Sequence, residues 1–254
     1  GTKRKFLLDS GSPQLILNAA HYGENEEKSD NEQKHVVNKS QGVGGSIGGM
    51  DIGTLESFDL GGIRMKDQQV IVMDLSHLEQ ELETEFYGLI GYDVISQYDV
   101  MFDYQNNKLV LIDPETYGDF LRENSRSIKD AIGFQMVEHI PVVDVRIGKD
   151  SYRMGIDCGA ETNLFDVSHF EKLKSCLSDI TTDSLGGADG NIQLVQKGKL
   201  NKMKIGYSGF KDTEAVFSDM SHFGDGLDGL IGYQILNSQR TILSFSSGQM
   251  ILLD

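Results

Sequence analysis

Phe6-Leu7-Leu8-Asp9-Ser10-Gly11-Ser12 and Met154-Gly155-Ile156-Asp157-Cys158-Gly159-Ala160 are the two stretches that decide the fold of this chain. In each stretch, a predicted apolar strand is followed by an aspartate on a turn that contains glycine. Each is followed downstream by an identical Gly-Leu-Ile-Gly-Tyr, at residues 88–92 and 229–233. One such turn is ordinary, because turns prefer Asp, Ser and Gly. Two copies, each in register with a second motif, indicate an internal duplication.

The residue numbers give the register of the duplication. Asp9 and Asp157 differ by 148, the glycine pairs Gly44-Gly45 and Gly186-Gly187 by 142, and Gly88 and Gly229 by 141. From there the halves align without a gap, so that residues 86–113 match residues 227–254. A long period repeated only twice predicts two homologous lobes and not a solenoid.

The repeat predicts an N-terminal lobe over 1–113, a helical linker over 114–133 and a C-terminal lobe over 134–254. Lobes of this size bury modest cores, so we expect them to share an interface. The charged, glycine-free stretch 25–39 predicts an exposed insertion in the first lobe.

Composition excludes several classes of protein. A net charge of −16 over 254 residues argues against a nucleic-acid partner, because phosphates need a basic patch. No apolar run is long enough to cross a bilayer. Cys158 and Cys176 are too few for a disulfide framework, and we interpret both as thiols. The six histidines lack metal-ligand spacing, so neither a metal nor another cofactor is expected.

Secondary-structure signals predict an all-β chain with a few short helices. Short β-rich apolar stretches are separated by turn residues at Lys5–Leu8, Gln69–Met73, Val100–Phe102, Leu109–Ile112, Val142–Ile147 and Ala215–Phe217. A capping box predicts a helix from Ser168, with Phe170, Leu173 and Leu177 on one face. Short helices are expected after each Gly-Leu-Ile-Gly-Tyr.

The lobes differ in what precedes the aspartate. Residues 139–156 predict a hairpin that turns at Gly148 and leads to Asp157, whereas eight residues precede Asp9. We hypothesise that the natural protein starts further upstream.

Two aspartates related by a pseudo-twofold axis can be brought face to face. Carboxylates about 3 Å apart cannot both ionise, so they share a proton and titrate as a unit. Such a pair can deprotonate a water while it protonates the oxygen of an amide carbonyl.

These residues resemble the aspartic proteases of the pepsin and retropepsin type. That family carries apolar-apolar-Asp-Thr/Ser-Gly-Ser/Thr/Ala and, later, apolar-apolar-Gly, which Leu89-Ile90-Gly91 and Leu230-Ile231-Gly232 match. The resemblance implies two closed-barrel lobes about a pseudo-twofold axis and endopeptidase activity on extended peptides, with no cofactor. Having both lobes in one chain favours a monomer. The location is left open by the sequence, with an extracytoplasmic one, periplasmic or secreted, as the favoured expectation.

The resemblance also implies roles for individual residues. Asp9 and Asp157 would be catalytic, and their turns would be supported by Ser10, Gly11, Ser12, Cys158, Gly159 and Ala160. Two glycine-rich hairpins would be flaps over the substrate, formed by Gly42, Gly44, Gly45, Ser46, Gly186, Gly187 and Ala188. Cys158 departs from the family's Thr or Ser, and a thiol is a poor hydrogen-bond donor.

Plainer interpretations remain open. The two aspartates could be turn residues inherited through duplication. Cys158 is better explained as a small buried filler than as a nucleophile, because a neighbouring carboxylate disfavours the thiolate. The alternative function is a catalytically silent two-lobed peptide-binding module. Retention of both aspartates favours the enzyme.

Overall fold

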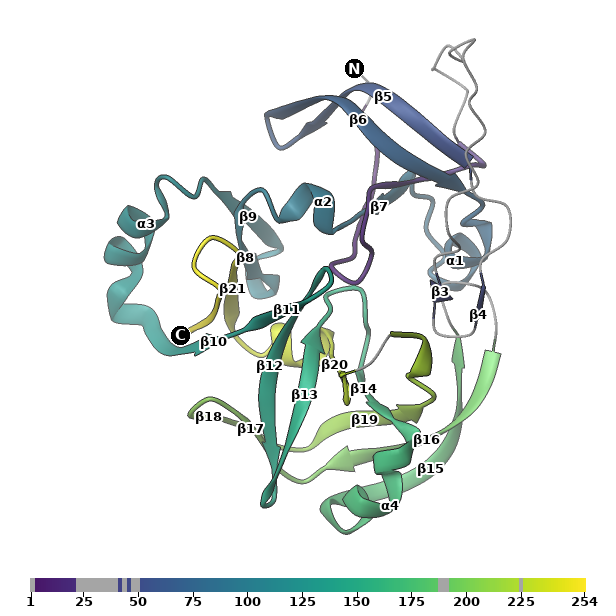
Figure 1. Ribbon diagram of the computed structural model, residues 1–254, viewed down its shortest axis with the longest axis vertical. Coiled ribbons are helices and arrows are strands. Elements are labelled where there is room, and N and C mark those ends of the chain that lie inside the picture. Colours follow the sequence, from purple (N-terminus) through teal and green to yellow (C-terminus); the bar gives the residue numbers. More distant parts are fainter. Residues whose placement is uncertain (1–2, 22–40, 43–44, 47–50, 187–191, 224–225) are drawn as a thin grey trace. The chain divides into compact units, whose positions relative to one another are not determined.

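The computed structural model describes residues 3–21, 41–42, 45–46, 51–186, 192–223 and 226–254. Over these residues strands dominate and helices are short (Figure 1). The expected all-β class is therefore confirmed. The chain divides into two compact units, Gly1–Val94 with Gly186–Ile192, and Ile95–Leu185 with Gln193–Asp254.

The first unit is built on a five-stranded sheet of order β1-β7-β2-β6-β5. Its central strand β2 runs antiparallel to β7 and parallel to β6, and β7 is parallel to β1. A buried apolar cluster around Ile16, Phe86 and Leu89 packs on it. The strands are β1 (Leu7–Leu8), β2 (Ile16–Asn18), β5 (Asp51–Leu60), β6 (Ile63–Met73) and β7 (Gly88–Ile90), accompanied by the short pair β3 (Gln41–Gly42) and β4 (Gly45–Ser46) and the helices α1 (Ser76–Glu81) and α2 (Tyr92–Ile95).

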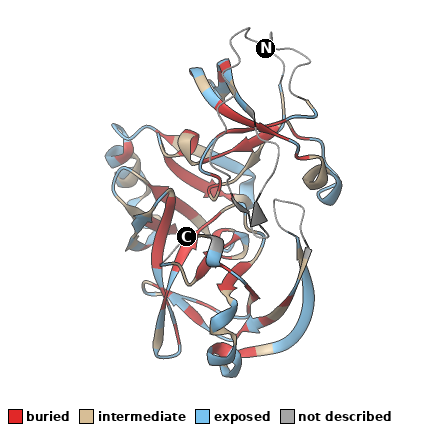
Figure 2. Ribbon diagram, turned by 45° about the vertical axis from the view of Figure 1, so that its right-hand side comes forward, coloured by how far each residue is buried: buried red, intermediate tan, exposed pale blue. Residues whose placement is uncertain are grey.

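The second unit contains a ten-stranded sheet of order β15-β16-β19-β14-β20-β13-β12-β17-β18, with β11 paired to β12. Strands β14 and β20 are buried almost throughout, whereas β15 is largely exposed (Figure 2). The strands are β11 (Gln135–Val137), β12 (Ile140–Ile147), β13 (Asp150–Ile156), β14 (Asn163–Asp166), β15 (Leu177–Gly186), β16 (Ile192–Leu200), β17 (Met203–Ile205), β18 (Ser208–Phe210), β19 (Thr213–Ser218) and β20 (Gly229–Ile231).

The duplication is visible in the order of the strands. Within the second sheet, β13-β20-β14-β19-β16 repeats the order β1-β7-β2-β6-β5 of the first unit. The directions agree too, since β13 is parallel to β20 while β14 is antiparallel to β20 and parallel to β19. The predicted repeat is therefore confirmed at the level of topology.

The register of the pairing is also repeated. Leu8 pairs with Ile90 as Ile156 pairs with Ile231. Likewise Ile16 pairs with Leu89 as Leu164 pairs with Leu230. In sheets a slip of one residue would turn every side chain to the opposite face, so agreement in register means that the same faces are buried in both repeats.

A second sheet of the second unit has the order β10-β22-β21-β8-β9 and combines both sequence repeats. Strands β8 (Asp99–Asp103) and β9 (Lys108–Ile112) come from the first repeat, whereas β21 (Arg240–Ser244) and β22 (Gln249–Leu253) come from the second. In the antiparallel pair of β8 and β21, Met101 lies opposite Ile242, its equivalent at an offset of 141. The pairing therefore maps onto itself when the repeats are exchanged, which defines a local twofold axis.

This shared sheet explains why the compact units do not end where the repeats do. The first repeat was expected to extend to residue 113, but the second unit begins at Ile95. Strands β8 and β9 pack with β21 and β22 over a common core that includes Met101, Ile112 and Ile242. The lobe boundary at residue 113 stays a prediction, as does closure of a lobe into a barrel.

The helical linker is shorter than predicted. Helix α3 spans Tyr117–Asn124 and is followed by a 3-10 turn at Ser125–Ser127. Ile128, which was expected on the helix, instead begins strand β10 (Ile128–Gly133), which pairs with β22. The non-local ladder thus overrides the local helical spacing.

The helix predicted from Ser168 is also different. It is a series of short turns, with a 3-10 turn at Val167–His169, α4 at Phe170–Leu173 and a second 3-10 turn at Lys174–Cys176. The cap is Asp166, whose carboxylate accepts the Ser168 N–H, and not Ser168 itself. Leu177 belongs to β15.

Several local predictions are confirmed. Helices α2 and α5 (Tyr233–Leu236) follow the two Gly-Leu-Ile-Gly-Tyr copies. The hairpin of β12 and β13 turns at Gly148, whose φ of 62° favours glycine. The turn between β8 and β9 is a 3-10 turn at Tyr104–Asn106, and another 3-10 turn spans Ser221–Phe223.

Among the described residues, the helices are too short and too polar to cross a lipid bilayer.

Candidate active site

The first aspartate turn lies at the end of β1. The Asp9 carboxylate folds back on its own turn, where Oδ1 accepts the N–H groups of Gly11 at 2.9 Å and Ser12 at 3.2 Å. The Asp9 N–H donates to the Ile90 carbonyl of β7 at 3.0 Å. This local capture of backbone N–H groups is the reason for Asp at such a turn. Its second oxygen, Oδ2, is not used in these two bonds.

The second turn repeats this geometry at the end of β13. Oδ1 of Asp157 accepts the Gly159 N–H at 2.8 Å, and the Asp157 N–H donates to the Ile231 carbonyl at 3.0 Å. Asp157 is buried and Asp9 is half-buried. In both turns, therefore, the aspartate carboxylate bonds to the turn and the aspartate N–H bonds to the equivalent strand of its repeat.

Glycine is required behind both turns because the backbones approach closely. A Cβ on Gly91 would lie 2.4 Å from the Gln14 carbonyl oxygen, and one on Gly232 would lie 2.3 Å from that of Thr162. Gln14 and Thr162 are equivalent positions at the offset of 148. The Gly-Leu-Ile downstream of each aspartate, β7 or β20, is thus a backing strand, and the glycine directly after it has space for backbone alone.

The structure describes the residues that were predicted to support the two turns. Ser10 and Ser12 are buried, and the Ser12 hydroxyl donates to the Gln14 carbonyl at 2.9 Å. The carbonyls of Ser12 and Ala160 accept the N–H groups of Tyr92 and Tyr233, each at 2.8 Å. Cys158 is a half-buried thiol beside Asp157, and Cys176 is also a thiol.

The expected flaps are described in part. Gln41–Gly42 and Gly45–Ser46 form the antiparallel pair β3–β4, so a hairpin occurs at the first predicted flap. Strands β15 and β16 flank the second, with β15 ending at Gly186. Gly44, Gly187, Ala188 and the insertion 25–39 lie outside the described residues. The role of the hairpins stays a prediction.

One residue of the first repeat lies near Asp157 without having been predicted there. The ring of Tyr104 meets the ring of Tyr233 edge to face, with centroids 5.0 Å apart. Burial raises the pKa of Tyr104, and the neighbouring Cys158, Tyr233 and Asp157 raise it further. The available sequence signal was the match of Tyr104 to Phe245 in the gapless alignment, where both repeats place an aromatic ring.

Asp9 and its turn belong to the first unit, and Asp157 with its turn belongs to the second. The pairing of Asp9 with Asp157 therefore stays a prediction. Within the described ranges, no cluster of three or more His, Cys, Asp or Glu side chains could hold a metal ion.

A family model described as aspartyl protease matches the chain twice, over residues 1–94 and 143–235. The chain belongs to the aspartyl protease family. The two matched segments carry the two aspartate turns and both copies of the Gly-Leu-Ile-Gly-Tyr motif, so the family match follows the internal duplication.

A crystal structure of a retropepsin-like aspartic protease from Rickettsia conorii is similar over 48% of this chain and 87% of that chain, with 16% sequence identity and a TM-score of 0.34. A comparison with curated proteins found no match.

Proposed function

We propose that this aspartyl protease chain is an active endopeptidase, which hydrolyses peptide bonds of extended peptides with a water activated between Asp9 and Asp157. The observation that carries the proposal is the repeated geometry of the two turns. In both, the aspartate N–H bonds to the backing strand at 3.0 Å and Oδ1 accepts a glycine N–H, at 2.9 Å and 2.8 Å. The agreement leaves the two carboxylates in equivalent positions of their repeats, as a pair that shares one proton requires.

The proposed reaction uses the two carboxyl groups as a pair that shares one proton. The ionised carboxylate takes a proton from the water, whose oxygen attacks the peptide carbonyl carbon, and the protonated partner donates its proton to the carbonyl oxygen. The tetrahedral intermediate then collapses as the C–N bond breaks: the protonated carboxyl group gives its proton to the leaving nitrogen, and the ionised one takes a proton from a hydroxyl group of the intermediate, which restores the pair. No covalent bond to the enzyme forms at any step.

The local twofold axis of the shared sheet supports this pairing. Since Met101 lies opposite its own equivalent Ile242, the strands β8 and β21 are related by a local twofold rotation. A twofold rotation places equivalent groups symmetrically about its axis, so that those close to the axis can meet. Asp9 and Asp157 are the equivalent carboxylates that this symmetry would bring together.

The flaps extend the proposal to the substrate. A glycine-rich hairpin can approach an extended peptide closely and pair with its backbone as an added strand. We therefore propose a peptide or protein substrate bound in extended form, under the two predicted flaps. Ser10 and Cys158 would support the two turns.

The test is cleavage of an unstructured protein between about pH 4 and pH 7, with and without a statine-type inhibitor, in the intact chain. Asp9→Asn and Asp157→Asn should each lower kcat by about a hundredfold or more, because each removes half of the acid–base pair. Mass spectrometry of the products would locate the cleaved bonds.

Asp59→Asn is the matched control, since Asp59 Oδ1 also accepts a glycine N–H, from Gly62 at 3.0 Å, but outside both motifs. Its activity should equal that of the unaltered chain. Cleavage that survives both catalytic substitutions would contradict the proposal. Peptide binding without any cleavage would favour the silent binding module.

A further inference from the structure

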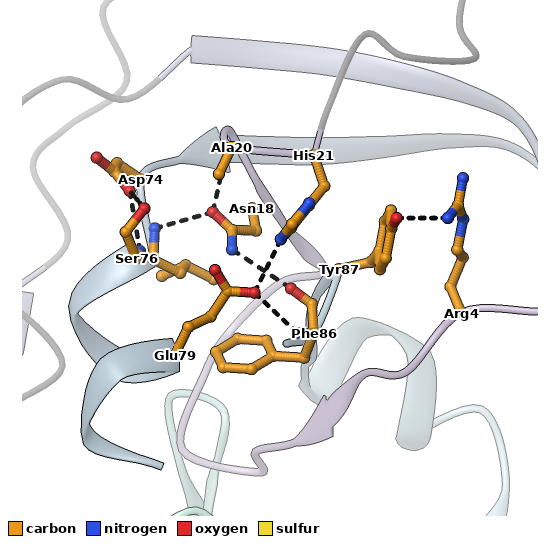
Figure 3. Close-up of polar contacts among 10 residues, drawn as sticks. Arg4, Asn18, Ala20, His21, Asp74, Ser76, Glu79, Phe86 and Tyr87 are labelled. Atoms are coloured by element: carbon orange, nitrogen blue, oxygen red, sulfur yellow. Dashed lines mark hydrogen bonds and ion pairs between the residues drawn. The ribbon is translucent and has the colours of Figure 1, made fainter. Parts of the chain in front are cut away.

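A histidine outside the catalytic motifs is bonded to a carboxylate in the first unit. His21 Nε2 lies 2.8 Å from Glu79 Oε1, and the same oxygen accepts the Phe86 N–H at 2.8 Å (Figure 3). Burial opposes ionisation of Glu79, but the bonds from Phe86 and His21 outweigh it, so the pKa of Glu79 lies below its usual value. Glu79 is therefore a carboxylate acceptor for both donors.

This pair fixes the chain where it enters the backing strand β7. Phe86 precedes Gly88, the first residue of β7, and its carbonyl accepts the Asn18 side-chain amide at 3.3 Å. Tyr87 donates its N–H to the carbonyl of Lys5, four residues before Asp9, at 2.7 Å. The segment from Phe86 to Ile90 is therefore hydrogen-bonded to the chain on both sides of β1, at Lys5 and at Asp9. The His21–Glu79 pair holds this segment at its start.

An equivalent pair occurs in the second unit. His169 Nε2 lies 2.8 Å from Asp228 Oδ1, and Asp228 Oδ2 accepts the Arg153 N–H at 2.7 Å. The Asp228 N–H in turn donates to the Arg153 carbonyl at 2.8 Å. Arg153 lies four residues before Asp157, as Lys5 lies before Asp9. The His169–Asp228 pair is therefore hydrogen-bonded to β13, the strand that leads to Asp157.

The histidines of the two pairs lie at equivalent positions of the repeats, but the carboxylates do not. His21 and His169 differ by 148, as Asp9 and Asp157 do. Glu79 comes from α1, whereas Asp228 directly precedes β20, at the position equivalent to Tyr87. The two repeats differ in much of their sequence, and yet the equivalent histidine is bonded to a carboxylate in each. Because the two carboxylates come from non-equivalent positions, we infer that the pair is required.

Each imidazole is also held against a tyrosine ring. The ring centroids of His21 and Tyr87 are 4.6 Å apart, and those of His169 and Tyr152 are 5.2 Å apart. The pairs are shielded only in part, since the side chains of His21 and Glu79 are 17% and 18% exposed and those of His169 and Asp228 are 24% and 32% exposed. Water could replace a lost imidazole as donor, but it would not fix the carboxylate in one position.

We propose that His21 and His169 are positioning residues, which hold the Asp9 and Asp157 turns in their reactive geometry through Glu79 and Asp228. The catalytic role of the two aspartates rests on the function proposed above. The placement of the turns by the histidines does not, because it concerns the hydrogen bonds of each unit separately.

The test uses His21→Leu and His169→Leu in the intact chain, which remove the donor, and His21→Gln and His169→Gln, whose amide can replace the Nε2 donor. The Leu variants should lower kcat by about tenfold to a hundredfold at nearly constant KM, because small displacements of catalytic groups act on the chemical step. The Gln variants should recover most of this loss. His77→Leu, on the same helix as Glu79 but outside both pairs, is the matched control.

Hydrogen exchange provides a readout that does not need activity. In each Leu variant the amide of the affected aspartate, Asp9 or Asp157, should exchange at least about tenfold faster. Reference amides in β5–β6 and β21–β22 should change much less. Equal acceleration at the reference strands, or no acceleration at the aspartates, would overturn the positioning role.

The two proposals can fail independently. If the intact chain cleaves nothing, the endopeptidase proposal fails while hydrogen exchange still decides the role of the histidines. If Asp9→Asn and Asp157→Asn abolish cleavage but the Leu variants keep full kcat, the positioning role fails and the proposed function stands.

Discussion

Glu79 shows how a single side chain can hold the chain beside one of the two aspartate turns. Its carboxylate accepts one backbone N–H and one imidazole N–H, and these bonds outweigh burial in setting a lowered pKa. A carboxyl group whose pKa is lower in the folded than in the unfolded chain stabilises the fold above its unfolded pKa of about 4.3. That contribution is lost as the pH falls through the folded pKa.

We therefore predict a pH-dependent cost for Glu79→Gln. At about pH 7 the substitution should lower the free energy of unfolding by about 2 kcal/mol, because bonds to a charged acceptor are lost. At about pH 3 the difference from the unaltered chain should shrink, since the carboxylate is then being protonated. Urea unfolding at both pH values measures this, with the exposed Glu81→Gln on the same helix as control. An equal cost at both pH values would contradict it.

Among the structural elements, the backing strands β7 and β20 place the strictest demands on sequence. A Cβ on Gly88 would lie 1.9 Å from the Ile16 carbonyl oxygen, and one on Gly229 would lie 2.1 Å from that of Leu164. Both strands are buried, so the neighbouring backbone has little room to move. This explains why the motif opens on glycine in both repeats.

We predict that Gly88→Ala and Gly229→Ala each destabilise the protein by about 3 kcal/mol or more, because backbone must shift to admit the methyl group. Gly118 in α3 is the contrasting site, since a Cβ there meets nothing within 4 Å. Gly118→Ala should stabilise the chain by up to about 1 kcal/mol, because alanine favours helix. Thermal unfolding of the three variants would reveal the opposite signs, and similar shifts in Tm would refute the close-approach argument.

For the whole molecule, the pairing of β8 with β21 is the structural consequence of the duplication. Val100 lies opposite Leu243 and Phe102 lies opposite Thr241, about the central pair of Met101 and Ile242. Because the pairing is self-complementary under exchange of the repeats, β21 could also pair with a second β21 in the same antiparallel register.

We predict that a fragment of residues 114–254, which lacks β8 and β9, forms a dimer through β21 with Ile242 opposite its counterpart. An unpaired strand edge above an apolar face favours such association. A fragment of residues 95–254, which retains both strands, should remain monomeric. Light scattering over a concentration series distinguishes the two, and a monomeric shorter fragment would argue against the self-complementary pairing.

The aspartate turns and their backing strands could be predicted from the sequence because their signals are local. Asp9-Ser10-Gly11 specifies a turn by residue type, and the constant offset to Asp157 identifies the second copy. The strand at Ile128–Gly133 could not be predicted in this way, because its helical spacing is overridden by pairing with β22, more than a hundred residues away. The acids that hold His21 and His169 were equally hidden, since they occupy non-equivalent positions.

By itself, the sequence determined the duplication, the two aspartate turns, the glycines behind them and the all-β class, because turns, strand periodicity and repeat offsets are properties of neighbouring residues. The tertiary structure alone decided that β8 and β9 join the second unit, that Tyr104 lies near Asp157 and that His21 and His169 each bond to a carboxylate. Those features depend on which distant segments pair, and the energy of such contacts appears only when the chain has folded.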